Sequence, residues 1–297
     1  MAWPDPGALV ALEARVERAL GAGGAGDLEV LGYGEISAVL ALDGPGGRFA
    51  CKRLPPFTGP ASLRAYRACL EDYLRALAAR GVRVAETAFL HLVRPGGTIS
   101  AYCVQAAFPA ESLLPAVLAR AGEARARALF ARLVDAVARS VGPGLGLDGQ
   151  VSNWAVAGED LVYLDVTTPL LRDQAGAERL DTDLFLASLP WALRGPVRRF
   201  LLGEILDKYY RPRGVVLDAL ANLVKERLDR WLPPFLEEAN ARLAPALSER
   251  EVRRAYASDA RMWALLQRLR RLDRAWQRRV RRRVYPFLLP DRIARHV

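Results

Sequence analysis

The order of the expected elements constrains the fold of this chain more than any other feature. β-type runs cover residues 28–31, 36–42 and 48–54, an amphipathic helix covers residues 62–80, and two further β-type runs cover residues 87–93 and 98–105. Turns rich in glycine and proline at residues 43–47 and 95–97 join neighbouring runs into hairpins. Three strands, one helix and two strands predict a five-stranded antiparallel sheet with a helix packed on it.

The character of the chain turns helical after a segment at residues 106–109 that we expect to be a hinge. The exception is residues 151–166, where two short β-type runs flank a turn at residues 158–160. We therefore expect an α+β protein of two parts. Residues 1–107 form an N-terminal helix and a β-rich lobe, and residues 108–297 form a larger helical lobe.

Composition excludes some classes of protein. Apolar residues make up 52% of the chain, too many for a disordered protein, and no uncharged run is long enough to span a membrane. Cys51, Cys69 and Cys103 lie in apolar runs without paired spacing, so we expect buried free thiols and a cytoplasmic protein. His91 and His296 are too isolated to form a histidine metal site. The net charge of +10 favours anionic partners without choosing among them.

Lysine is scarce, and its retention points to a task. Only three of the 43 basic residues are lysines, and Lys52 lies in the strand-like run 49–54. Arginine would keep the positive charge but would spread it over a broad planar group. A lysine retained here therefore suggests a compact point charge placed on a phosphate.

A glycine-rich turn precedes this lysine. Residues 31–39 contain the pattern G-x-G-x-x-S-x-V, formed by Gly32, Gly34, Ser37 and Val39. Glycines at a turn between two strands let backbone N–H groups approach phosphate oxygens closely. Turns of this kind are common, so the pattern gains weight only in combination with other motifs later in the chain.

Three oxygen-bearing side chains lie beyond the expected hinge. Asp148 and Asn153 form a D-x₄-N pattern, and the predicted hairpin then returns the chain to Asp165. In phosphoryl transfer an aspartate of such a pattern orients or deprotonates the acceptor hydroxyl, while the asparagine and the second aspartate hold Mg²⁺. The ordered series of glycine turn, lysine, hinge, D-x₄-N, hairpin and aspartate predicts an ATP site.

In this order the motifs resemble the protein-kinase-like superfamily, nearer to its aminoglycoside-phosphotransferase and choline-kinase-like branch than to protein kinases. The chain also resembles an uncharacterised bacterial family within that superfamily. The ordered motifs cover residues 28–170. The resemblance implies a bilobal protein-kinase-like fold that binds ATP and Mg²⁺ between its lobes.

The resemblance also assigns roles to residues. It gives phosphate clamping to Lys52 and Glu71, which could pair with each other. It gives adenine contact to the hinge with Gln105 and Ala107, catalysis to Asp148 with Lys52, and metal binding to Asn153 and Asp165. The chain departs from the family's pattern before Asp148, where Gly146-Leu147 replaces the usual His-Arg or His-Gly. The usual support of the catalytic loop is therefore missing from the sequence.

We expect an ATP- and Mg²⁺-dependent phosphotransferase that acts on the hydroxyl of a small-molecule metabolite, with Asp148 positioning the hydroxyl. Because of the departure before Asp148, a catalytically weak kinase-fold module that binds nucleotide or a partner (a pseudokinase) is a second hypothesis. A nucleotidyl transferase on the same fold is a third. Asp181 and Asp183 fit either a cationic acceptor or a helix cap, and we favour the cap.

Arginines crowd residues 268–283 of a predicted helix. We expect a buried apolar stripe on this helix, formed by Leu265, Leu266, Leu269, Leu272, Trp276 and Val280. The arginines are interpreted either as a patch for nucleic acid or anionic lipid or as a solvated helix face. We favour the solvated face, and no sequence motif for base recognition accompanies the arginines.

Overall fold

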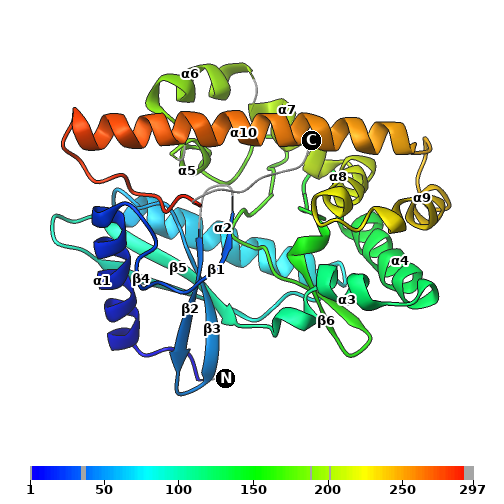
Figure 1. Ribbon diagram of the computed structural model, residues 1–297, viewed down its shortest axis with the longest axis horizontal. Helices are drawn as coiled ribbons and strands as arrows, with labels where there is room; N and C mark the ends of the chain where they lie inside the picture. Colours follow the sequence, from blue (N-terminus) through cyan, green and yellow to red (C-terminus); the bar gives the residue numbers. More distant parts are fainter. Residues whose placement is uncertain (1, 35–37, 188, 201, 291–297) are drawn as a thin grey trace.

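The computed structural model of the chain describes residues 2–34, 38–187, 189–200 and 202–290, so Ser37 of the glycine-rich turn lies outside the described residues. Figure 1 shows a β-rich N-terminal part beside a mainly helical part, with one long helix running across the upper part of the molecule. The α+β class and the five-stranded antiparallel sheet are both confirmed.

The sheet contains β1 (Val30–Tyr33), β2 (Ala38–Gly44), β3 (Gly47–Arg53), β4 (Thr87–Val93) and β5 (Ile99–Ala106) in the spatial order β1-β2-β3-β5-β4. All neighbouring strands are antiparallel. The central strand is β3, in which Lys52 lies opposite Val39 of β2 and Cys103 of β5. Residues opposite each other in a sheet share a face, so these three side chains point the same way.

A helix covers each face of the sheet, because successive strand residues point to opposite sides. Helix α2 (Pro60–Ala79) packs with Cys103 and the other side chains on the face of Lys52. Helix α1 (Pro6–Ala22) packs on the opposite face, against Phe49 and Cys51. The side chain of Asp5 caps α1 by accepting a hydrogen bond from the N–H of Ala8 (3.0 Å).

A buried polar cluster ties α1 to the sheet. Arg53 follows Lys52 on β3 and points to the opposite face, where its Nε and Nη2 donate to the carboxylate of Glu13 at 3.0 and 2.8 Å. Ser100 Oγ donates to the same carboxylate at 2.7 Å, and Tyr102 also donates to it. Burial raises the pKa of Glu13, but the charge and hydrogen bonds of Arg53 outweigh it and the net shift is downward. Arg53 Nη1 also donates to the carbonyl of Pro286 (3.3 Å), which ties the C-terminal segment to the same cluster.

The second part of the chain is helical apart from one hairpin. The hairpin consists of β6 (Trp154–Ala157) and β7 (Asp160–Tyr163), as predicted. The helices are α3 (Leu114–Arg120), α4 (Glu123–Ser140), α5 (Asp183–Leu186), α6 (Trp191–Phe200), α7 (Leu202–Asp207), α8 (Pro212–Lys225), α9 (Leu232–Asn240) and α10 (Glu249–Arg279). One extended core joins α2, α4, α8 and α9.

The orientation of α10 differs from the prediction. Four residues of the expected buried stripe are exposed, namely Leu265 (52%), Leu272 (67%), Trp276 (48%) and Val280 (56%). The buried side of this part of the helix carries Trp263, Gln267, Arg270 and Asp273 instead.

The contacts of α10 explain the difference. Arg270 lies over the ring of Phe287, with its guanidinium carbon 5.5 Å from the ring centroid. Arg274 donates to the carbonyl of Gly23 (3.1 Å), and Arg278 donates to the carbonyls of Ala22 and Gly21 at 3.3 and 3.0 Å. These carbonyls belong to the C-terminal end of α1, where the helix dipole favours cations. The polar side of α10 therefore faces the protein because α1 and residues 285–290 offer acceptors and an aromatic ring.

Two further expectations can be compared with the structure. Cys51, Cys69 and Cys103 are buried free thiols, as predicted, and burial raises the pKa of Cys51 and Cys103 to about 12. Among the residues that the structure describes, no helix is long and apolar enough to cross a membrane.

Candidate functional site

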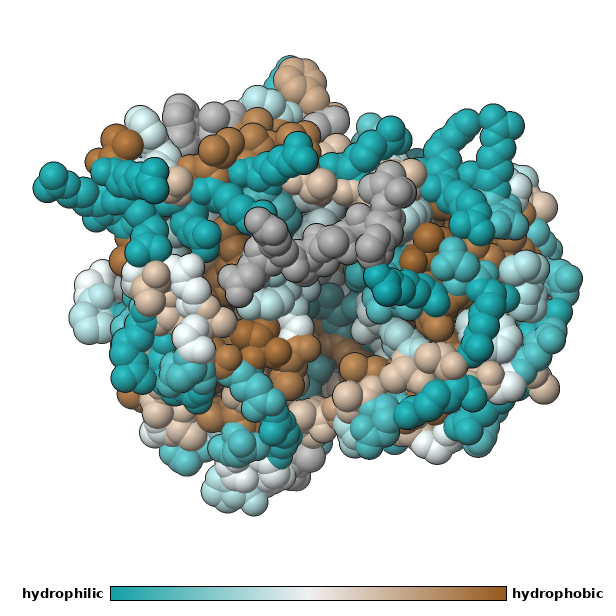
Figure 2. Space-filling model, in the orientation of Figure 1, coloured by the Kyte–Doolittle hydropathy of each residue, from teal (hydrophilic) through white to brown (hydrophobic). Residues whose placement is uncertain are grey.

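Lys52 and Asp165 meet where the sheet adjoins the helical part. Lys52 Nζ donates to Asp165 Oδ1 at 2.6 Å, and the two side chains are 17% and 25% exposed. Figure 2 shows that this face of the molecule is hollowed near its middle, between the surface of the sheet and that of the helical part. The two residues are 113 positions apart in the chain, so the fold brings together two members of the predicted series.

Asp165 is held through one of its two oxygens. Oδ1 accepts from Lys52 and also from the N–H and Oγ1 of Thr167, at 3.3 and 2.9 Å. No described residue donates a hydrogen bond to Oδ2. Burial alone would raise the pKa of Asp165, but the charge of Lys52 and the three hydrogen bonds lower it. The carboxylate is therefore ionised at neutral pH, with one oxygen left to bind a cation.

Asn153 is fixed by the loop that carries Asp148. Its Nδ2 donates to the backbone carbonyl of Asp148 at 3.3 Å. The carbonyl of Asn153 accepts from the N–H of Leu164 (2.9 Å), which holds Asn153 beside the residue that precedes Asp165. The hydrogen bond from Nδ2 leaves Oδ1 as the side-chain atom of Asn153 that can bind a cation.

Backbone hydrogen bonds and one tyrosine hold the loop before Asp148. Gly146 donates its N–H to the carbonyl of Leu170 (2.9 Å), and its own carbonyl accepts from the hydroxyl of Tyr73 on α2 (3.2 Å). Leu147 donates its N–H to the carbonyl of Tyr209 (3.1 Å). A Cβ at Gly149 would lie 2.5 Å from a methyl carbon of Val215 on α8, so this glycine is required by close packing. These contacts fix the position of the loop at Gly146-Leu147 without a histidine.

Asp148 has the most perturbed carboxyl in this region. Burial raises its pKa to about 7, and the negative charges of Asp218 and Asp165 add to the effect, while Lys208 and the N–H of Gln150 oppose it. Gln150 donates that N–H to Asp148 Oδ1 at 3.2 Å. A carboxyl with a pKa near neutrality suits general-base catalysis, because it is partly ionised and still basic enough to accept a proton.

A polar cluster beside Asp148 was missed from the sequence. Asp218 of α8 accepts from Gln150 Nε2 (3.2 Å) and from Lys208 Nζ (3.1 Å). Asn222, one turn further along α8, donates to Gln150 Oε1 (3.3 Å) and accepts from the N–H of Ser152 (3.1 Å). The sequence contained one signal for this cluster, since Lys208 is another of the three lysines in the chain. The scarcity of lysine that pointed to Lys52 applies equally to Lys208.

The expected pairing of Lys52 with Glu71 is not formed. Glu71 is exposed and pairs with Arg67 one turn away (3.0 Å), and its neighbour Asp72 pairs with Arg179. The apolar stripe of α2 faces the sheet, which turns the acidic positions outward. Tyr66 reaches the site from α2 instead, where its hydroxyl donates to the carbonyl of Thr167 at 2.9 Å.

The expected hinge lies between β5 and the helical part. Gln105 Nε2 donates to Thr87 Oγ1 (2.9 Å) and to the carbonyl of Leu164 (3.0 Å). The N–H of Ala107 donates to the carbonyl of Arg48 (2.8 Å). Gln105 thus links β5 to the residue before Asp165, and the N–H of Ala107 is already used within the sheet.

The described part of the glycine-rich turn flanks the face of Lys52. Gly32 pairs with Val39 across β1 and β2, and Val39 in turn pairs with Lys52. A Cβ at Gly32 would meet no atom within 4 Å, so packing does not account for this glycine. Gly34 ends the first described range.

The donor set was compared with the requirements of Mg²⁺. Among residues 2–34, 38–187, 189–200 and 202–290, no group of three or more His, Cys, Asp or Glu side chains could hold a metal ion. The expected site needs only one aspartate and one asparagine, because Mg²⁺ prefers hard oxygen ligands and keeps several waters. Asp165 Oδ2 and Asn153 Oδ1 are oxygens of this kind, so the residues present fit Mg²⁺.

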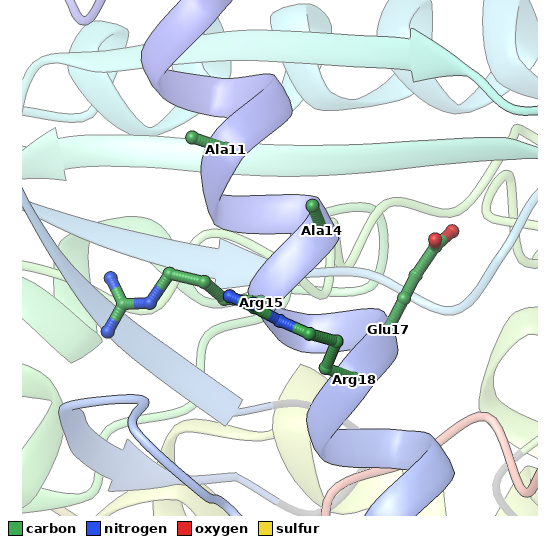
Figure 3. Close-up of a pocket in the computed structure, with 5 residues that line it drawn as sticks. All are labelled: Ala11, Ala14, Arg15, Glu17 and Arg18. Carbon is green, nitrogen blue, oxygen red and sulfur yellow. The ribbon is translucent and has the colours of Figure 1, made fainter.

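Two other surface features lie apart from this constellation. Asp181 accepts from the N–H of Asp183 (2.9 Å) at the start of α5, which agrees with the preferred interpretation as a helix cap. Figure 3 shows a shallow hollow on α1, lined by Ala11, Ala14, Arg15, Glu17 and Arg18. Because α1 covers the opposite face of the sheet from Lys52, this hollow is separate from the candidate site.

The comparisons with known proteins identify a family. No curated protein matches the chain. Residues 11–274 match a family described as a family of unknown function (DUF6206). The match includes the whole sheet, all residues of the candidate site and most of α10. The chain therefore belongs to the DUF6206 family of proteins of unknown function.

Proposed function

We propose that this protein is an ATP- and Mg²⁺-dependent phosphotransferase that acts on the hydroxyl of a small molecule. The observation that carries the proposal is the ion pair of Lys52 and Asp165, formed beside a buried carboxyl whose pKa is about 7. Asn153 is in turn hydrogen-bonded to the backbone carbonyl of Asp148, the residue that carries this carboxyl. A lysine, a general-base carboxyl and two oxygen ligands for a metal ion are the groups that phosphoryl transfer needs.

The chain's own residues would divide the work. Lys52 would place its ammonium on the phosphates, and the N–H groups of the turn after β1 would surround them. Asp148 would accept the proton of the acceptor hydroxyl, for which a pKa near neutrality is suited. Asp165 and Asn153 would hold Mg²⁺, which when bound neutralises charge on the phosphate oxygens.

The polar cluster of Gln150, Asp218 and Lys208 would act on Asp148 and not on the phosphates. The charges of Asp218 and Lys208 have opposite effects on the pKa of Asp148. Gln150 connects the two sides, since its N–H bonds Asp148 and its side chain bonds Asp218. This cluster would therefore set the basicity of Asp148 and its position in the loop.

A kinase-fold module that binds nucleotide without transferring phosphate is the second candidate. It is favoured by the exposure of Glu71, which leaves Lys52 without an acidic partner on α2. The engaged N–H of Ala107 points in the same direction, since a hinge N–H is a usual contact for adenine.

The test measures nucleotide binding and turnover together. We expect MgATP to bind, and ADP to form in the presence of a hydroxyl-bearing acceptor found by screening a metabolite library. Asp165→Ala should abolish both turnover and the Mg²⁺ dependence of binding. Asp160→Ala is the matched control, because Asp160 lies on β7, shortly before Asp165, but pairs with Arg83 at the surface.

The outcomes separate the candidates. MgATP binding without turnover on any acceptor would favour the binding module, and release of pyrophosphate in place of ADP would indicate nucleotidyl transfer. No binding of any nucleotide, or equal binding by the wild type and Asp165→Ala, would refute the assignment of an ATP site.

A further inference from the structure

The outward face of α10 carries an apolar seam. Met262, Leu265, Leu272, Trp276 and Val280 are each about half or more exposed. Their spacing, completed by the partly buried Leu269, is three or four residues at every step up to Val280 at the C-cap, so the side chains form one continuous line along the helix. A solvated helix face would be polar instead, and exposed apolar residues in a contiguous line mark an interaction surface.

Arginines border this seam and extend beyond it. Residues 261–284 hold ten arginines and one acidic residue, Asp273, which is buried. Arg261, Arg268 and Arg279 are exposed and lie on one side of the seam, about 60–80° from its middle at 100° per residue. Arg281, Arg282 and Arg283 come after the end of the helix and are also exposed. The seam therefore has a strongly cationic border with no exposed acidic residue within it.

Figures 1 and 2 show where this surface lies. Helix α10 runs across the upper part of the molecule in Figure 1, below α6, and extends over both the helical part and the end of α1. Hydrophobic and strongly hydrophilic surface alternate in the upper part of Figure 2. The exposed apolar residues follow the length of the C-terminal half of this helix.

We propose that α10 binds an anionic lipid bilayer surface, lying in the interface with its apolar seam toward the acyl chains. A helix that combines Leu and Trp on one face with bordering arginines is the type that lies in the membrane interface. The arginines would meet the lipid phosphates while their aliphatic stems lie along the apolar boundary. Trp276 suits the boundary itself, where an apolar ring meets a polar headgroup region.

The charge pattern disfavours two other partners. A second copy of this chain, paired antiparallel through the seam, would bring one arginine border against the other, and like charges repel. A nucleic acid would use the arginines but would leave the apolar seam in water, because phosphate contacts carry such binding. Only a partner that is apolar within and anionic at its surface satisfies both features.

Vesicle co-sedimentation of the full chain tests the proposal. The two vesicle types are phosphatidylcholine alone and equal parts of phosphatidylcholine and phosphatidylglycerol. We expect binding to the anionic vesicles only, weakening as salt is raised, with a blue shift of tryptophan emission. Arg268→Gln, Arg279→Gln and Arg283→Gln combined should lower partitioning on the order of a hundredfold. Leu265→Asn with Leu272→Asn should lower it about tenfold or more.

Matched controls carry the same chemical changes elsewhere. Val93→Asn replaces an exposed apolar residue of β4, and Arg125→Gln replaces an exposed arginine of α4. Both should bind vesicles as the wild type does. The substituted positions on α10 and at Arg283 are exposed, so each variant should keep the wild-type melting temperature, which a thermal melt checks.

Four results would overturn the proposal. The first is absence of binding to anionic vesicles, and the second is equal binding to neutral ones. The third is binding of double-stranded DNA at the same salt concentration, if the arginine variant loses this binding and the leucine variant keeps it. That result would indicate a nucleic-acid surface. The fourth is a dimer in light scattering that the leucine variant converts to a monomer, which would assign the seam to contacts between copies of the chain.

Discussion

Replacing Asp148 with asparagine should increase stability at neutral pH while removing activity. The folded protein holds the pKa of this carboxyl at about 7, against an ordinary value of 3.8. The shift from 3.8 to about 7 means that ionising Asp148 in the folded state costs at most about 4 kcal/mol. Because, in addition to burial, the charges of Asp218 and Asp165 contribute to this shift, we expect roughly half of the cost, about 2 kcal/mol, to be recovered by Asp148→Asn.

The sign of the effect depends on pH. The folded pKa is raised, so the folded state binds the proton more tightly than the unfolded chain does. The wild type therefore loses stability as pH rises from about 4 to about 7, and the loss is constant above that window. The variant has no proton to lose at this position. The difference between the two proteins should be small at pH 4 and largest above pH 7.

Urea unfolding at a series of pH values measures this difference. Asp165→Asn is the control with opposite sign, because Lys52 and Thr167 lower the pKa of Asp165. Its carboxylate contributes stability above the ordinary value of 3.8, and this stability is lost as pH falls through the folded pKa. Asp165→Asn should therefore be less stable than the wild type at neutral pH. A stability difference for Asp148→Asn that does not change with pH would refute the reasoning about Asp148.

Three further predictions concern individual contacts. Lys52→Arg should lower ATP turnover roughly a hundredfold to a thousandfold, because a broad guanidinium replaces one well-placed charge. The melting temperature should shift little, and full activity would return Lys52 to a structural role. Glu13→Ala should destabilise the protein by about 3–5 kcal/mol in urea unfolding, because a buried arginine loses its partner. Glu17→Ala at the surface should cost about 1 kcal/mol or less. Equal losses of stability in the two variants would contradict the role of the buried pair. Arg274→Ala combined with Arg278→Ala should speed amide hydrogen exchange at the last turn of α1, because that helix end loses its cationic partners. Unchanged exchange would show that these two arginines do not stabilise the end of α1.

The sheet was predictable because its signals are local. Strand runs, hairpin turns and the apolar stripe of α2 each depend on a few neighbouring residues, and together they leave one arrangement of three strands, a helix and two strands. The placement of Lys52 and Asp165 at one site was also expected, from the order of motifs and not from any local pattern, but their direct ion pair was not predicted.

The remaining features depend on contacts between distant segments. The periodicity of α10 identifies an amphipathic helix, but it cannot tell which side faces the protein when the partner surface offers carbonyls. The pairing of Glu71 was mispredicted for a similar reason, because the face of α2 that packs on the sheet is apolar and aromatic. Lys208 and Asp218 are separated from Asp148 by 60 and 70 residues, so only the folded chain reveals their effect on its pKa.

The side chain of Arg53 makes the two ends of the chain interdependent. It lies next to Lys52 on the central strand, points to the opposite face, and bonds both Glu13 near the N-terminus and the carbonyl of Pro286 near the C-terminus. Residues 1–107 expressed alone would keep the strand and lose the carbonyl, together with the arginines that cap α1. The β-rich lobe is therefore a poor unit to excise. Deletions from the C-terminus that reach residue 286 should change the strand that carries the lysine of the candidate site.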